Sequence, residues 1–179
     1  MKLNRCLCIV FAVICLCGFA LAIVFECHSC QFWSNIFIGV FSSSLLAFAT
    51  ALISYLVARR EALQSYLGTL QAYAARLRQL KRHYSLRDDL TASYESLECY
   101  FYDMHYNAYL KIQSLFTRGS FAKELNKAFE YASFVRENIR PGLELTSQVL
   151  EQAEEKLNSA IKIVKAKLEN KPIKDETTA

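Results

Sequence analysis

Glycine and proline are scarce in this sequence, with five and two copies among 179 residues. Few glycines leave little material for phosphate-holding loops, and none of the patterns G-x-x-x-x-G-K-[ST], G-x-G-x-x-G, G-x-S-x-G or H-E-x-x-H occurs. Neither His83 nor His105 has Glu three residues before it, so the Glu-x-x-His pairs of di-iron helical proteins are also missing. We therefore expect no enzyme activity, no cofactor and no metal site.

Charged side chains are missing from two stretches, residues 6–25 and 31–58, although they make up 21% of the chain. Each stretch is long enough to cross the roughly 30 Å hydrocarbon core of a bilayer as a helix. We predict a transmembrane hairpin over residues 1–58, with spans at about 6–25 and 35–58. Neither span contains an ionisable residue, which argues against a pump or a transporter.

Basic residues flank the two stretches only at the ends that lie away from the connecting segment. Lys2 and Arg5 precede the first stretch, Arg59 and Arg60 follow the second, and the connecting segment has no Lys or Arg. The positive-inside rule then places both termini in the cytoplasm, so we expect a multi-pass protein of the cell membrane, or of the inner membrane in a bacterium. An alternative for the first stretch is a cleaved signal peptide, because residues 20–22 read Ala-Leu-Ala.

Small side chains recur along one face of each span, which lets another helix approach closely. These faces either close the hairpin on itself or pack between protomers of an oligomer. The residues are Gly39, Ser43, Ala47 and Ala51 in the second span and Cys8, Ala12, Cys15 and Ala22 in the first.

Two cysteines of the connecting segment, Cys27 and Cys30, form a C-x-x-C pair. No second pair of ligands lies in this segment, so a loop disulfide or free thiols are favoured over half of a zinc site.

Apolar residues continue at heptad spacing immediately after the second span. The helix is therefore predicted to run on without a break to about residue 83, because its burial partner changes from lipid to other helices. The residues of this predicted seam are Leu63, Tyr66, Leu70, Tyr73, Leu77 and Leu80.

Three more amphipathic stretches follow, at about 86–116, 120–139 and 142–170, before a polar tail at 172–179. Together with the helix at 59–83 they predict a cytosolic antiparallel bundle of about four helices over residues 59–171. The predicted fold class is all-α, a two-span hairpin followed by this bundle.

Two clusters are candidates for a partner or ligand surface. The basic cluster could attract an anion, although cations also stabilise the end of a helix. The aromatic cluster could anchor a protein, although wide helix interfaces use tyrosine too. The residues are Arg76, Arg78, Lys81 and Arg82 in the first cluster and Tyr102, Tyr106 and Tyr109 in the second.

Strong nucleic-acid binding is not expected, because the basic excess is small. Of 21 Lys and Arg and 17 Asp and Glu, only two basic and one acidic residue precede Arg59, which leaves +3 for the rest.

Two functions fit these features. The first is a membrane-anchored, non-enzymatic interaction, scaffold or signalling module with a protein partner or a homo-oligomeric state. The alternative is an oligomeric two-span effector that perturbs the membrane when its bundle is triggered. In layout this alternative resembles the small two-span effectors of bacterial conflict systems, such as the SLATT-type proteins, and that resemblance implies membrane-directed activity.

Overall fold

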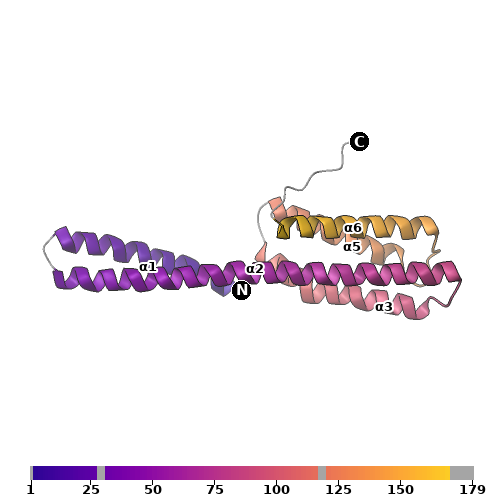
Figure 1. The fold of residues 1–179 in the computed structure, drawn as a ribbon, viewed down its shortest axis with the longest axis horizontal. Helices are drawn as coiled ribbons and strands as arrows, with labels where there is room; N and C mark the ends of the chain where they lie inside the picture. The colour runs from indigo at the N-terminus through magenta and orange to yellow at the C-terminus, as the bar shows by residue number, and fades with distance from the viewer. Residues whose placement is uncertain (1, 28–30, 117–119, 170–179) are drawn as a thin grey trace. The chain divides into compact units, whose positions relative to one another are not determined.

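The computed structural model describes residues 2–27, 31–116 and 120–169, and the side chains of residues 2–8 and 120 lie outside that description. Every regular element in these ranges is helical, which confirms the all-α class (Figure 1). The chain divides into two compact units, Met1–Arg59 and Arg60–Ala179. The elements are α1 (Lys2–Cys27), α2 (Gln31–Leu86), α3 (Thr91–Tyr102), the π-helix η1 (Asp103–Tyr109), α4 (Leu110–Leu115), α5 (Ser120–Asn138) and α6 (Ser147–Leu168).

The first unit is a hairpin of α1 and the first part of α2. The rings of Phe25 and Phe37 stack with their centroids 5.3 Å apart, and the Ser34 hydroxyl donates a hydrogen bond to the Glu26 carboxylate at 2.8 Å. Both helices extend beyond the predicted spans, because α1 continues to Cys27 and α2 already begins at Gln31. The polar residues between the spans therefore belong largely to the helix ends, where such contacts hold them.

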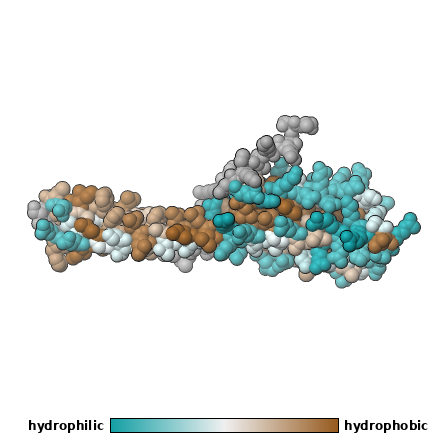
Figure 2. Space-filling view, viewed as in Figure 1, coloured by the Kyte–Doolittle hydropathy of each residue, from teal (hydrophilic) through white to brown (hydrophobic). Residues whose placement is uncertain are grey.

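Apolar side chains make up much of the visible surface of this first unit, beside a smaller number of hydrophilic ones (Figure 2). Stretches within Ile9–Cys27 and Gln31–Leu86 reach mean hydropathies of 2.7 and 2.2, and only 11% and 6% of their residues are buried. Leu46 is 71% exposed and Leu16 is 69% exposed. Both helices are thus long and apolar enough to span a membrane, and they lack the burial that a core helix of a water-soluble protein shows.

The second part of α2 supplies a helix face to the core of the second unit. All six residues of the predicted heptad seam, from Leu63 to Leu80, are buried. The helix is 56 residues long and continues through Gly68 to Leu86, three residues beyond the predicted end. Gly68 does not interrupt it because this residue lies on the exposed side, away from the seam.

Helices α5 and α6 lie side by side in the second unit and run in opposite directions (Figure 1). Side chains from α2 reach the other helices of this unit. Tyr66 contacts Tyr109 with ring centroids 6.0 Å apart, and the Lys81 ammonium lies 2.8 Å from the Glu154 carboxylate. The buried residues of these helices therefore form a common apolar core.

Two predicted helix starts are wrong, and a local turn explains each difference. The helix expected from residue 86 begins at Thr91, after Arg87 adopts a φ of 59° and the Asp89 carboxylate accepts hydrogen bonds from Thr91. The helix expected from residue 142 begins at Ser147. Gly142 has a φ of 88°, which ends regular structure, and Thr146 then caps α6.

A π-helix interrupts the predicted helix at 86–116 and changes which residues face the core. Over η1 the helix has more residues per turn than an α-helix, so residues five positions apart lie on the same face. Met104 is fully buried, and Tyr109 is only 5% exposed. Tyr109, expected on the surface from α-helical spacing, is therefore a core residue.

Candidate functional site

Gly39, in the predicted small-residue face of the second span, does not lie at the close contact of the hairpin. A Cβ atom added at Gly39 would meet no described atom within 4 Å, whereas one at Gly18 would lie 3.4 Å from the Phe41 backbone nitrogen. The close approach of α1 and α2 therefore involves Gly18, which the spacing argument missed. Ala22 of the predicted first-span face is buried, while Ala12 and Cys15 are half-buried and the Cys8 side chain lies outside the described residues.

An apolar groove runs along the side of the hairpin that carries Gly39. Its volume is 570 Å³, and α1 contributes Phe11 and Ile14 to its wall. Ser43 is exposed and Ala47 and Ala51 are half-buried, so the groove leaves most of the predicted face accessible. Within the described first unit, this side of α2 is available to lipid or to another helix.

Cys27 is an exposed free cysteine at the end of α1, and Cys30 lies outside the described residues. The loop disulfide therefore stays a prediction.

Two residues of the basic cluster are engaged within the second unit. The Arg76 guanidinium donates a hydrogen bond to the Tyr100 hydroxyl at 3.0 Å and lies 4.8 Å from that ring's centroid. Lys81 pairs with Glu154, and the hydrogen bond to this carboxylate raises the pKa of Lys81. Arg78 and Arg82 are exposed. The cluster is thus split between internal contacts and solvent.

The aromatic cluster is joined by a residue that no local pattern indicated. Tyr102 and Tyr106 stack with centroids 5.9 Å apart on the exposed side of the helix. The Arg136 guanidinium, from α5, donates a hydrogen bond to the Tyr102 hydroxyl at 3.0 Å and lies 5.1 Å from its ring centroid. Tyr109 instead stacks on Phe129 in the core. Only two of the three predicted tyrosines therefore contribute to the surface.

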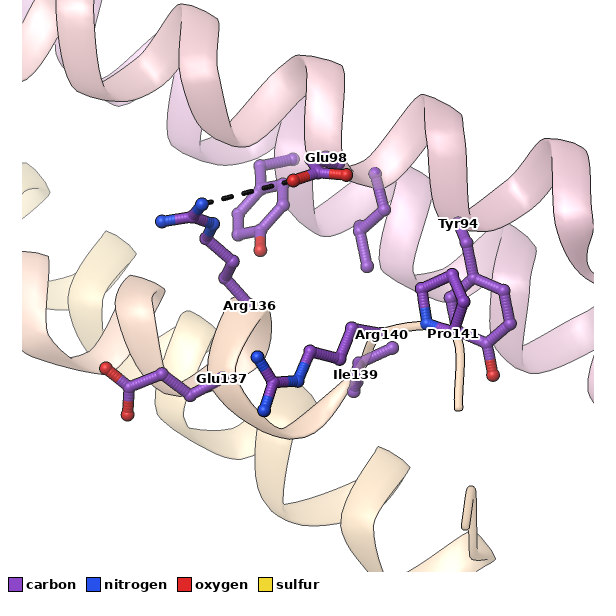
Figure 3. Close-up of a pocket in the computed structure, with 9 residues that line it drawn as sticks. Tyr94, Glu98, Arg136, Glu137, Ile139, Arg140 and Pro141 are labelled. Carbon is purple, nitrogen blue, oxygen red and sulfur yellow. Dashed lines mark ion pairs between the residues drawn. The ribbon is translucent and has the colours of Figure 1, made fainter. Parts of the chain in front are cut away.

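A cleft opens beside Arg136, between α2, α3 and the end of α5 (Figure 3). Its volume is 240 Å³. Figure 3 shows Arg136 and Glu98 facing each other at one end, Tyr94 and Pro141 at the other, and Arg140 across the opening from Glu98. We call it the Arg136 cleft, and its principal lining residues are Tyr73, Tyr94, Leu97, Glu98, Arg136 and Arg140.

Tyr73 gives the Arg136 cleft a buried polar group. The residue is fully buried, and its hydroxyl has no hydrogen-bond partner among the described residues. Burial raises the pKa of Tyr73, and the nearby Arg136 charge lowers it by a smaller amount. The phenol is therefore protonated throughout the physiological pH range and can donate a hydrogen bond.

The charges around the Arg136 cleft are unevenly paired. The Arg136 guanidinium lies 4.0 Å from the Glu98 carboxylate, a long ion pair between two exposed side chains. Arg140 has no ion-pair partner in the part of the chain that the structure describes. Glu137 also lines the cleft, but its carboxylate points away from it in Figure 3. One guanidinium is therefore available to an anion.

Across the described residues, no three His, Cys, Asp or Glu side chains are grouped so that they could hold a metal ion. No protein-family model, curated protein or solved structure matches the chain.

Proposed function

We propose that the protein is a membrane-anchored, non-enzymatic helical interaction and signalling module. Its first unit is a two-span transmembrane hairpin, and its second unit is an antiparallel bundle of four helices in the cytoplasm. The bundle consists of the second part of α2, the helix formed by α3, η1 and α4, and the helices α5 and α6. The lipid bilayer and a protein partner, or further copies of the chain, are the expected interaction partners.

The contrast between the surfaces of the two units carries this proposal. In the first unit, large apolar side chains such as Leu16, Leu46 and Ile53 are more than half exposed. In the second unit, the described residues include few large exposed apolar side chains, and the helices bury theirs in a common core. Removing apolar surface from water is worth roughly 25 cal/mol per Å², so lipid is the favourable solvent for the first unit alone.

Hydroxyl groups of the hairpin also fit a hydrocarbon surrounding. The Ser42 and Thr50 hydroxyls, both exposed, donate to the carbonyl oxygens of Ile38 and Leu46 at 2.9 Å. A hydroxyl in hydrocarbon has no water to bond, so an internal acceptor of this kind lowers its burial cost. The positions of Lys2, Arg5, Arg59 and Arg60 supply the cytoplasmic orientation, through the positive-inside rule.

A charge placed in the second span tests the anchor. Leu46→Arg puts a guanidinium near the middle of the apolar stretch, where insertion costs about 2.5–3.5 kcal/mol. We expect the wild type to stay in the membrane pellet after alkaline carbonate washing and the variant to shift toward the supernatant or be degraded. Gln64→Arg, at an exposed position of the second unit, is the matched control and should leave the distribution unchanged. Wild-type protein that washes off quantitatively would refute the anchor.

A second candidate function, an oligomeric membrane effector, is favoured by the accessible groove along Gly39. We expect Gly39→Leu to reduce the oligomer size measured by light scattering in mild detergent and to relieve any growth arrest that expression causes. Gly68→Leu fills an equally open glycine position in the second unit and serves as the control. A wild-type monomer in detergent, with an unchanged membrane potential during expression, would exclude the effector and leave the anchored module.

A further inference from the structure

We infer that the Arg136 cleft binds a small organic anion, either a carboxylate or a phosphate, with a ring-sized apolar body. The inference concerns the second unit alone and goes beyond the proposed function, because it does not depend on the membrane anchor. It places the anionic group of the ligand at Arg140, with one oxygen of that group accepting a hydrogen bond from the Tyr73 hydroxyl.

The Tyr73 hydroxyl is the first observation that points to a ligand. A buried hydroxyl without a partner costs about 1–3 kcal/mol, so such groups are uncommon unless something bonds them. Tyr73 is among the residues that line the cleft, so this buried, unpartnered hydroxyl belongs to the wall beside the space that a ligand would fill. An acceptor oxygen on a ligand would satisfy it.

The charge balance decides the sign of the ligand. Glu98 offsets Arg136 at 4.0 Å, and Arg136 also donates to the Tyr102 hydroxyl, so this guanidinium is largely committed. Arg140 has no such partner among the described residues, and Glu137 is directed away from the cleft (Figure 3). The cleft thus presents about one uncompensated positive charge. Guanidinium groups bind carboxylates and phosphates through paired hydrogen bonds.

The size and the wall residues of the cleft indicate the size and polarity of the uncharged part of the ligand. Its volume is 240 Å³. An apolar cavity of about 150 Å³ is enough for benzene in another protein, so this cleft has room for a six-membered ring with a charged substituent. The Tyr94 ring and the side chains of Leu97 and Ile139 supply apolar contact along it. A ring that carries an acidic group therefore fits both the space and the charge.

Calorimetric titration of the full-length protein in a mild detergent tests the inference. Benzoate and phenyl phosphate are the two anionic probes and distinguish a carboxylate from a phosphate preference. Benzamide has the shape of benzoate without its charge. We expect saturable one-to-one binding of at least one anion, with benzamide bound about tenfold more weakly because it lacks the charge-assisted bond.

Variants then locate the site. Arg140→Gln and Tyr73→Phe should each weaken binding of the anion by about tenfold, since each removes one hydrogen-bond donor. Two matched controls should bind like the wild type. Tyr66→Phe removes another buried, unpartnered hydroxyl that does not line the cleft, and Arg82→Gln removes an exposed guanidinium elsewhere. Circular dichroism of each variant checks that the helices are retained.

Three results would overturn the inference. The first is no saturable binding of either anion up to its solubility limit. The second is equal affinity for benzoate and benzamide, which would remove the role of charge. The third is anion binding that Arg140→Gln and Tyr73→Phe both leave unchanged, which would place it outside the Arg136 cleft.

Discussion

Removing one buried oxygen atom, in the variant Tyr66→Phe, should stabilise the second unit. Tyr66 is fully buried, and its hydroxyl has no hydrogen-bond partner among the described residues. The neighbouring Tyr109, with its ring centroid 6.0 Å away, differs in this respect, because its hydroxyl donates to the Asn126 side-chain oxygen at 2.9 Å. The same substitution at Tyr109 should therefore have the opposite sign, which makes the two positions a matched pair.

The magnitudes follow from the two environments. An unpaired hydroxyl costs about 1–3 kcal/mol on burial, and Tyr66→Phe removes this cost. The small gap that the substitution leaves offsets part of the stabilisation, so we expect the free energy of unfolding to rise by about 1 kcal/mol. Tyr109→Phe loses one neutral hydrogen bond and should cost about 1 kcal/mol. The two variants should differ by about 2 kcal/mol in the free energy of unfolding.

Urea unfolding of the full-length protein in detergent, followed by the tyrosine near-ultraviolet circular dichroism, measures this difference. All tyrosines except Tyr55 lie in the second unit, so the signal reports on that unit. If Tyr66→Phe destabilises the unit, or if both variants shift the midpoint in the same direction, the assignment of an unpaired hydroxyl at Tyr66 is refuted.

The same residue predicts a pH dependence. Burial, with a smaller effect from Tyr109, raises the pKa of Tyr66 above the ordinary tyrosine value of about 10. The unfolded chain then loses this proton at lower pH than the folded chain. The difference in pKa therefore has no effect on stability below about pH 10. Above that pH the free energy of unfolding falls as the pH rises, because the unfolded state binds fewer protons than the folded state. Tyr66→Phe should reduce this alkaline loss of stability, whereas an unchanged alkaline slope would contradict it.

Three further predictions concern local features of the second unit and are measured by the same unfolding assay. Thr146→Ala removes the side-chain cap of α6 and should lower the free energy of unfolding by about 1 kcal/mol. An unchanged unfolding midpoint would show that the cap does not stabilise the unit. Gly142→Ala should lower the free energy of unfolding by about 1 kcal/mol because of the positive φ at this residue. Gly68→Ala, at an open helical position, should raise it by up to about 1 kcal/mol. Changes of the same sign in the two variants would contradict the two backbone assignments. A double-mutant cycle on Lys81 and Glu154, both partly exposed, should give a coupling of about 0.5 kcal/mol that declines with salt, and a salt-independent coupling would argue against an ion pair.

Much of the helical architecture follows from the sequence because its signals are local and periodic. The heptad spacing from Leu63 to Leu80 identifies the buried face of α2 without knowledge of what covers it. The absence of charge from residues 31–58 likewise identifies an apolar helix. Helix starts were less predictable, since Arg87 and Gly142 act through the backbone conformation of a turn, which residue type alone does not specify.

The tertiary structure decided which faces meet. Spacing of small residues could not distinguish Gly39 from Gly18, because both are small and only the packing of α1 on α2 brings one of them close to a backbone. Tyr109 became a core residue because the π-helix changes the angular step that α-helical spacing assumes.

The Arg136 cleft lay beyond sequence reasoning for the same reason. Tyr73, Glu98 and Arg140 belong to segments separated by tens of residues, and no periodic pattern relates their side chains. A sequence determines which surfaces of a helix are apolar, because each residue carries its hydropathy with it. Which of those surfaces meet, and which polar groups they leave unpaired between them, depends on the packing of the whole unit.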